Sequence, residues 1–195
     1  MDDIRLILKI KDGDQDAFCT LVKKYQTQVL RTAYLISNNR YTSEEIVQET
    51  FVQCYLHIGK LKNPNQFKSW FYKILIRTAW KQIKKDNCAI PTESIIEKAD
   101  FESINDTLNC YIQNEFAEAV YAEIQQLEIK QKTVILLYYY SGLNVKEIAK
   151  IMDCFEGTVK SRLFTARKNL KQNLKDLQFE NVKEGKYFDE KLNSI

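Results

Sequence analysis

The sequence predicts an all-α fold, arranged as two small helical domains joined by a flexible acidic linker. Apolar residues recur at the three- and four-residue spacing of amphipathic helices, and no stretch shows the alternation of a half-buried strand. Only five Gly and two Pro occur among 195 residues, which suits long helices and disfavours a turn-rich all-β fold. Where the periodicity weakens, acidic residues accumulate, as is typical of a linker. The expected segments are a first domain at 1–88, the linker at 89–112, a second domain at 113–177 and a tail at 178–195.

The first domain reads as a succession of helices with recognisable start signals. Asp14 or Asp16 can cap the second of them, because a short acidic side chain accepts hydrogen bonds from the free amides of a first turn. Thr42 and Glu45 have the spacing of a capping box, which predicts the start of the third helix. The sequence thus predicts helices at about 4–10, 18–34, 44–58 and 67–85.

The second domain contains the most informative stretch, residues 141–170. Helical periodicity breaks at 153–155, where no apolar stripe can continue, and then resumes. Asn144 can cap the helix before the break, with Glu147 three residues on reaching back to the free amide. Two helices separated by a tight turn in this way are typical of a helix-turn-helix, with which the second domain ends.

The second helix of this motif has a cationic, hydrogen-bonding face. Such a face suits the major groove of DNA, where a recognition helix presents side chains to base edges and phosphates. The alternative is an amphipathic helical hairpin whose basic face is merely solvated. The side chains of this face are Thr158, Lys160, Ser161, Arg162, Phe164, Thr165, Arg167 and Lys168.

Charge is strongly segregated along the chain, although the net charge is only +3. Residues 60–85 carry eight basic and no acidic groups, and residues 130–175 carry ten basic and three acidic groups. Residues 86–129, between them, carry one basic and ten acidic groups. Two basic blocks predict two nucleic-acid contact surfaces. We further hypothesise that the acidic segment lies against the basic blocks in the free protein and suppresses DNA binding.

The first basic block, 60–85, also interleaves cations with aromatic side chains. Single-stranded nucleic acid is held by this combination, because cations track phosphates and flat rings receive unstacked bases. However, several of these rings also fit one apolar helix face, so we expect Trp70 and Phe71 to be in the core. For Tyr72 and Trp80 the two alternatives remain open.

Several classes of function are disfavoured. The five Cys are scattered and never paired as C-x-x-C, which argues against a disulfide framework or a metal site and for the reducing cytoplasm. The N-terminus does not read as a signal peptide, and the longest apolar run, 134–140, is too short to span a bilayer. His57 is the only histidine, and no phosphate-binding glycine loop occurs. The sequence predicts no cofactor and no catalysis by this chain itself.

Four stretches together resemble a known family. They are DGDQDAFCTLVKKY (12–25), EEIVQETFVQCYLHI (44–58), FKSWFYKILIRTAWKQI (67–83) and GLNVKEIAKIMDCFEGTVKSRLFTARKNL (142–170). In this order and spacing they are distributed between residues 12 and 170 and resemble the bacterial RNA polymerase sigma factors, specifically the small extracytoplasmic-function (ECF) type of the sigma-70 family. The resemblance implies a sigma factor that binds core polymerase and directs initiation at promoters through their −10 and −35 elements.

The resemblance also implies a role for each segment. The helix at 44–58 would dock on the coiled coil of the largest polymerase subunit, through Glu45, Ile46, Gln48, Glu49, Thr50, Phe51 and Gln53. The loop at 60–66, which would receive a flipped base, and the helix that follows would melt and read the −10 element, through Lys62, Asn63, Asn65, Gln66, Trp70, Lys73, Arg77, Trp80 and Lys81. The basic face of the helix-turn-helix would read the −35 element.

Further partners implied by the resemblance are the polymerase flap and an anti-sigma factor, which in this family is often anchored to a membrane. Arg77 stands where the family commonly has Asn, so the resemblance does not define the −10 preference. Two alternatives are an ordinary DNA-binding regulator, which would dimerise on a palindrome and ignore polymerase, and a helical adaptor that binds only proteins. The helix at 44–58 favours the sigma factor over both.

Overall fold

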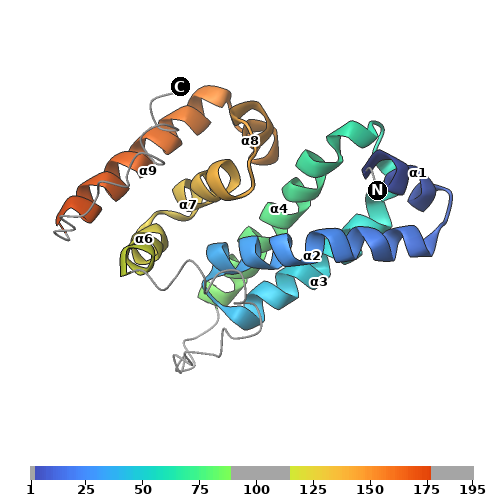
Figure 1. Cartoon of the computed structure of the whole chain (residues 1–195), viewed down its shortest axis with the longest axis horizontal. Coiled ribbons are helices and arrows are strands. Elements are labelled where there is room, and N and C mark those ends of the chain that lie inside the picture. Colours follow the sequence, from blue (N-terminus) through green and yellow to red (C-terminus); the bar gives the residue numbers. More distant parts are fainter. Residues whose placement is uncertain (1–2, 89–114, 177–195) are drawn as a thin grey trace.

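The computed structural model describes residues 3–88 and 115–176, which form two helical lobes (Figure 1). No strand occurs in either described segment, and the all-α prediction is confirmed. The proposed linker, 89–112, and the tail, 178–195, lie outside the described residues. The first lobe consists of α1 (Asp3–Lys11), α2 (Gln15–Ser37), α3 (Arg40–His57), η1 (Ile58–Lys60), η2 (Pro64–Gln66) and α4 (Phe67–Cys88). The second consists of α6 (Glu115–Gln126), α7 (Ile129–Ile135), the π-helical turn η4 (Leu136–Tyr140), α8 (Val145–Ile151) and α9 (Glu156–Asp176).

Polar side chains set the ends of the helices, in one case differently from the prediction. Asp14 caps α2 by accepting a hydrogen bond from the Ala17 amide at 2.9 Å. The predicted Thr42 cap of α3 is wrong. Asn39 takes that role three residues earlier, accepting from the Thr42 amide at 2.9 Å. The Thr42 hydroxyl instead donates to the carboxylate of Asp86 at 3.0 Å and so fastens α3 to the end of α4.

Aromatic side chains fill the core of the first lobe. The Phe71 ring stacks on Phe67 with centroids 5.4 Å apart, and it lies within 5.5 Å of both Tyr25 and Phe51. Each favourable aromatic pair adds about 0.5–1.5 kcal/mol beyond the burial of its area. Phe71 and Tyr72 are fully buried, so Phe71 is a core residue as expected and Tyr72 joins it. Trp70 is only half-buried and packs against this core from outside.

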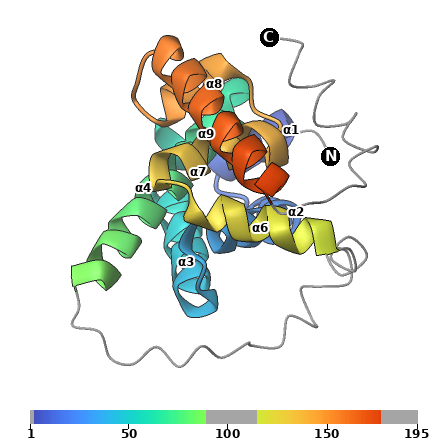
Figure 2. The ribbon, with the colours of Figure 1, turned by 90° about the vertical axis from the view of Figure 1, so that its left-hand side faces the viewer.

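The two lobes lie directly against one another. Helix α4 runs along the side of the first lobe that faces α8, as Figures 1 and 2 both show. At the other end of the contact the hydroxyl of Tyr121 donates to Asn38 Oδ1 at 2.8 Å, and Gln125 donates to the carbonyl of Leu35 at 3.2 Å. The second lobe therefore covers parts of both α2 and α4.

Candidate nucleic-acid interface

The second lobe presents α9 as the outer helix of a helix-turn-helix. The capping box that begins α8 is confirmed, because the Asn144 and Glu147 side chains each accept from the other's backbone amide, at 3.0 and 2.9 Å. Asp153 adopts a left-handed backbone (φ 49°) in the turn, a conformation that Asp tolerates better than most residues. Val159, Leu163, Ala166 and Leu170 make the buried stripe of α9.

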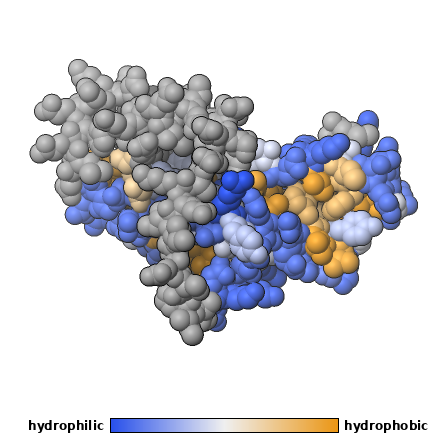
Figure 3. All heavy atoms as spheres, turned by 90° about the horizontal axis from the view of Figure 1, so that it is seen from below, coloured by the Kyte–Doolittle hydropathy of each residue, from blue (hydrophilic) through white to orange (hydrophobic). Residues whose placement is uncertain are grey.

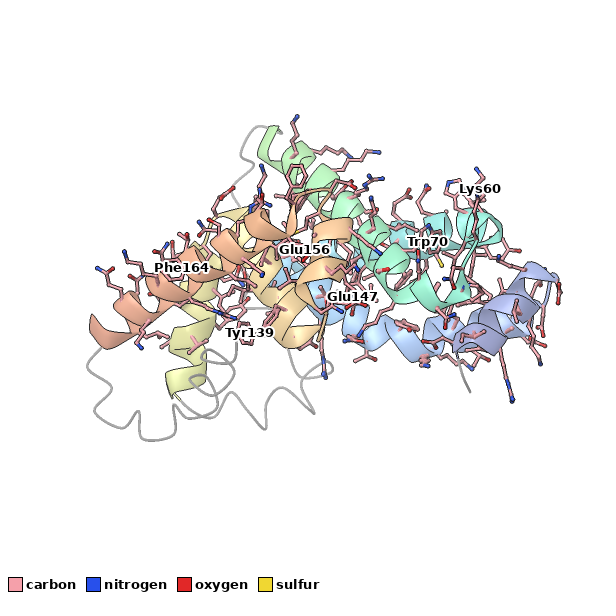
Figure 4. All side chains as sticks on the ribbon, turned by 90° about the horizontal axis from the view of Figure 1, so that it is seen from above. Lys60, Trp70, Tyr139, Glu147, Glu156 and Phe164 are labelled. Atoms are coloured by element: carbon pink, nitrogen blue, oxygen red, sulfur yellow. The ribbon has the colours of Figure 1, made fainter. Side chains whose placement is uncertain are left out.

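Four of the eight predicted −35 residues are exposed on α9. Three of them are polar, and the fourth, Phe164, is 70% exposed in spite of its size. Figure 4 shows Phe164 and Lys60 toward opposite ends of the molecule. Lys171 extends the same face by another turn and was missed, although it follows Lys168 at helical spacing. The exposed predicted residues are Lys160, Ser161, Phe164 and Lys168.

The other four are partly buried, and two of them are engaged within the lobe. The guanidinium of Arg167 lies 5.5 Å from the ring centroids of both Tyr138 and Tyr139, which makes it a cation–π clamp on η4. Arg162 reaches back over the turn, with its Nη1 3.8 Å from the Sγ atom of Cys154. Thr158 and Thr165 flank the outward face at intermediate exposure. A basic residue outside the apolar stripe of α9 is therefore not always available to bind DNA, because Arg162 and Arg167 contact other groups of the same lobe.

The predicted −10 loop lies in the first lobe, around η2. Lys62, Asn63, Asn65 and Gln66 are all exposed. The Asn63 side chain accepts a hydrogen bond from the Asn65 amide at 3.0 Å and so caps η2, with Pro64 at the first helical position. The loop is therefore held by its own turn while its amide groups remain accessible to a ligand.

On α4 the second lobe already contacts three of the predicted −10 residues. The Asp153 carboxylate accepts a hydrogen bond from Lys73 through one oxygen and from Arg77 through the other, the latter at 2.6 Å. Hydrogen bonds from Lys73 and then Arg77 hold the pKa of Asp153 below its usual range. The indole N–H of Trp80 donates to the Thr133 hydroxyl at 3.2 Å. Lys81, which is also predicted to bind −10 DNA, is exposed and has no such contact in the described segments.

The predicted polymerase-binding residues divide into outer and inner ones. Gln48 and Glu49 are exposed. Glu45 accepts a hydrogen bond from Gln82 at 2.5 Å, and Gln53 donates to Glu49 at 2.8 Å. The remaining three differ from the expectation, because they lie on the side of α3 that packs into the lobe and can only position the helix. The buried three are Ile46, Thr50 and Phe51.

An apolar strip on the outer side of α3 was missed. Val52, Tyr55 and Leu56 are 51%, 50% and 61% exposed, and Leu8 of α1 is 50% exposed. The rings of Tyr55 and Phe18 pack at a steep angle to each other, with centroids 4.9 Å apart. Figure 3 shows apolar side chains gathered at this end of the molecule. The available signal was that six of the eight residues at 51–58 are apolar, more than one face of a helix can bury.

The second lobe also has a cavity of about 390 Å³ between α6, α7 and α9. The Asn173 amide donates to Glu123 at 2.6 Å across its rim. Its lining is mixed acidic, amide and apolar: Glu123, Gln126, Leu127, Glu128, Gln131, Asn169, Leu170 and Asn173. Across residues 3–88 and 115–176, no three potential metal-ligating side chains come together, and no helix is long and apolar enough to cross a membrane.

These features define a helical DNA-binding protein with a helix-turn-helix in one lobe and a second basic, aromatic helix in the other. Comparison with known proteins makes the class specific. Residues 21–87 match the family described as sigma-70 region 2, and residues 117–170 match the one described as sigma-70, region 4. The chain belongs to the ECF RNA polymerase sigma factors, and it directs promoter-specific initiation of transcription. Sigma factors are initiation factors rather than enzymes.

Relatives similar to this chain support that assignment along nearly its whole length. The ECF RNA polymerase sigma-E factor of Haemophilus influenzae is 32% identical over 187 residues, which cover 91% of this chain and 97% of the relative. The RNA polymerase sigma-H factor of Pseudomonas aeruginosa is 29% identical over 183 residues, covering 90% and 95%.

Solved structures share the fold. CnrH, solved in complex with the cytosolic domain of CnrY, superposes with a TM-score of 0.67 at 19% identity, covering 89% of this chain and 97% of CnrH. The sigma factor RpoE of Bartonella quintana, solved with the anti-sigma factor NepR, superposes with a TM-score of 0.62 at 23% identity, covering 81% and 96%.

Proposed function

We propose that the two lobes divide promoter recognition between them. The lobe that contains α9 would read the −35 element, and the loop around η2 together with α4 would open and read the −10 element. The observation that carries this division is the presence of a separate cationic surface on each lobe. Lys160 and Lys168 face solvent on α9, while Lys62 and Lys81 do so in the first lobe. The proposed domain limits, 1–88 and 113–177, follow the same division.

We assign core polymerase binding to the outer face of α3. Gln48 and Glu49 supply its polar part, and the strip formed by Val52, Tyr55 and Leu56 supplies its apolar part. A docking face of this kind, with exposed apolar side chains next to polar groups, is what a specific protein interface requires. The proposed partners are the coiled coil of the largest polymerase subunit for α3 and the flap for the second lobe.

An anti-sigma factor is a further proposed partner, since both structural neighbours named above were solved with a protein bound: the cytosolic domain of CnrY and the anti-sigma factor NepR. We place the protein's site of action in the cytoplasm, where polymerase and promoter DNA meet.

Transcription with purified components tests the proposal. Core polymerase is incubated with fragmented genomic DNA, with and without this protein, and the start sites are sequenced. New discrete starts that share two upstream elements are the expected result. New starts that share only one upstream element would contradict the division of promoter recognition between the two lobes.

A charge reversal on α3 tests the docking face. Glu49→Lys should abolish the new starts but leave DNA binding by the free protein unchanged. Asp12→Lys, which makes the same charge change at an exposed position in the turn between α1 and α2, is the matched control and should keep full activity. If both variants initiate equally well, α3 is not the docking helix.

A further inference from the structure

Helix α1 packs against the loop that connects α3 to α4, the predicted −10 loop at 60–66. It contacts both η1 and η2, as can be followed in Figure 1. Leu6, Ile7 and Ile10 are the buried residues of α1, and Leu61, between the two short helices, is buried as well. The Nζ atom of Lys11, the last residue of α1, donates a hydrogen bond to the backbone carbonyl of Leu61. A side chain at the end of one helix thus holds the backbone of the loop.

Other hydrogen bonds of this loop are local. The Gln66 amide donates to the Asn63 carbonyl at 3.0 Å, and the Asn63 side chain accepts from the Asn65 amide. Both bonds join residues within three positions of one another, so they fix the shape of the loop but not its place on the lobe. Lys11 comes from 50 positions before its partner. Together with the buried Leu61 side chain, it ties the loop to the rest of the first lobe.

Helix α1 is itself fastened at both ends. Gly13 has a left-handed backbone (φ 92°), and its amide and the next one donate to the carbonyls of Ile10 and Lys9, both at 3.0 Å. This pair of bonds is a Schellman motif, which satisfies the last carbonyls of a helix and fixes its final turn. At the first turn, the Asp3 carboxylate accepts from the Tyr25 hydroxyl of α2 at 2.6 Å. The last side chain of α1 therefore starts from a defined position.

We propose that Lys11 is a positioning residue for base recognition by the −10 loop. It holds the Leu61 carbonyl so that the side-chain amides of the loop stay where an extruded base can bond to them. These amides belong to Asn63, Asn65 and Gln66. A site that is ordered before binding loses less conformational entropy with the correct base, whereas a looser site adapts to wrong bases and discriminates less. This inference rests on the proposed role of the loop in reading the −10 element.

The variants separate positioning from a direct contact of Lys11 with DNA phosphate. Lys11→Met removes the charge and the donor but keeps an unbranched side chain. Lys9→Met is the matched control, because both lysines are exposed and lie in the last turn of α1. Both variants therefore lose one charge and the same favourable interaction with the carbonyl end of the helix. Lys11→Arg keeps a cationic donor and should restore the wild-type behaviour.

Base preference is measured with the protein bound to core polymerase. A pool of short single-stranded DNA with randomised positions is selected on each complex, and sequencing gives the enrichment of each base. The double variant Asn65→Ala/Gln66→Ala marks the position that the loop reads. At that position Lys11→Met should lower the enrichment of the preferred base by about three- to tenfold, as for the loss of one hydrogen bond that orders a site. Lys9→Met and Lys11→Arg should keep the preference, and the salt dependence of affinity should stay unchanged.

Hydrogen exchange tests the anchor without DNA or polymerase. In the free protein, the backbone amides of a peptide covering 58–67 should exchange faster in Lys11→Met than in wild type. Lys9→Met should exchange there like wild type. Equal exchange in all three proteins would mean that Lys11 does not hold the loop, and the proposal would be wrong.

The selection has outcomes that overturn the proposal separately from the role of the loop. If the double variant loses a preference that Lys11→Met keeps, or if Lys9→Met loses as much as Lys11→Met, Lys11 is not a positioning residue. Uniform weakening on all sequences, with a salt slope lower by about one, would make Lys11 a phosphate contact instead. If the double variant loses no preference at any position, the loop does not read bases, and the proposed −10 role fails together with this inference.

Discussion

Helices α4 and α9 both combine cations with aromatic side chains, but they differ in what those groups contact. In α4, Lys73 and Arg77 bind Asp153. In α9, Lys160 and Lys168 face solvent and form no ion pair within the described segments. A cationic helix face in the sequence therefore predicts only that an anion can bind there. Whether a carboxylate of the same chain already binds to it depends on the tertiary structure.

The largest expected effect is on the core that supports α4. Phe71→Ala removes a fully buried ring that pairs with four other aromatic side chains. The loss of unfolding free energy should be about 3–5 kcal/mol, as for other Phe→Ala changes in well-packed cores. Urea denaturation followed by circular dichroism measures it. A loss below about 1 kcal/mol, the range of surface changes, would mean that α4 is not anchored in this way.

A smaller effect is expected on the outward face of α9. Phe164 is 70% exposed, so Phe164→Ala should leave stability nearly unchanged. If the ring contacts a thymine methyl group in the major groove, binding to −35 duplexes from mapped start sites should weaken by about 1–3 kcal/mol. Fluorescence anisotropy on the natural duplex and on single-base variants measures this. Equal weakening on every duplex would show that Phe164 does not read sequence.

Arg167 and Lys168 are neighbours that should behave oppositely. Arg167→Ala removes a cation that lies over two tyrosine rings, so it should cost about 1 kcal/mol of stability and leave the salt dependence of DNA binding unchanged. Lys168→Ala removes an exposed cation, so it should leave stability unchanged and lower the slope of log affinity against log salt by about one. Thermal unfolding and a salt titration on both variants decide between the roles. If the two variants exchange these results, the contrast drawn within α9 is wrong.

Local sequence signals predicted the local structure, and they failed where distant segments meet. The all-α fold and the capping box of Asn144 and Glu147 depend on residues within one helical turn, and both are confirmed. Thr42 had the right spacing for a cap, but Asn39 precedes it and the Thr42 hydroxyl is held by Asp86, 44 positions away. The roles assigned to individual residues in binding remain predictions.

Asp153 shows why the rest could not be predicted. Its two partners are 76 and 80 positions earlier in the chain, and neither hydrophobic periodicity nor charge counts link residues over such a distance. In the sequence Asp153 marked only a break between two helices. Similarly, α3 has enough apolar residues to cover more than one face, but the sequence alone did not say that Val52 and Leu56 face outward.

The smallest effect concerns reactivity alone, and it compares one cysteine of each lobe. Cys54 lies in the core behind α3, and burial raises the pKa of its thiol to about 12. Since the thiolate is the reactive form, Cys54 should resist iodoacetamide at pH 8 until the first lobe unfolds. Cys154, at intermediate exposure in the turn of the helix-turn-helix, should react in the native protein, and the exposed Cys19 should react fastest. Peptide mapping by mass spectrometry gives the three rates. Equal rates for Cys54 and Cys154 would mean that the core of the first lobe opens to the reagent in the folded protein.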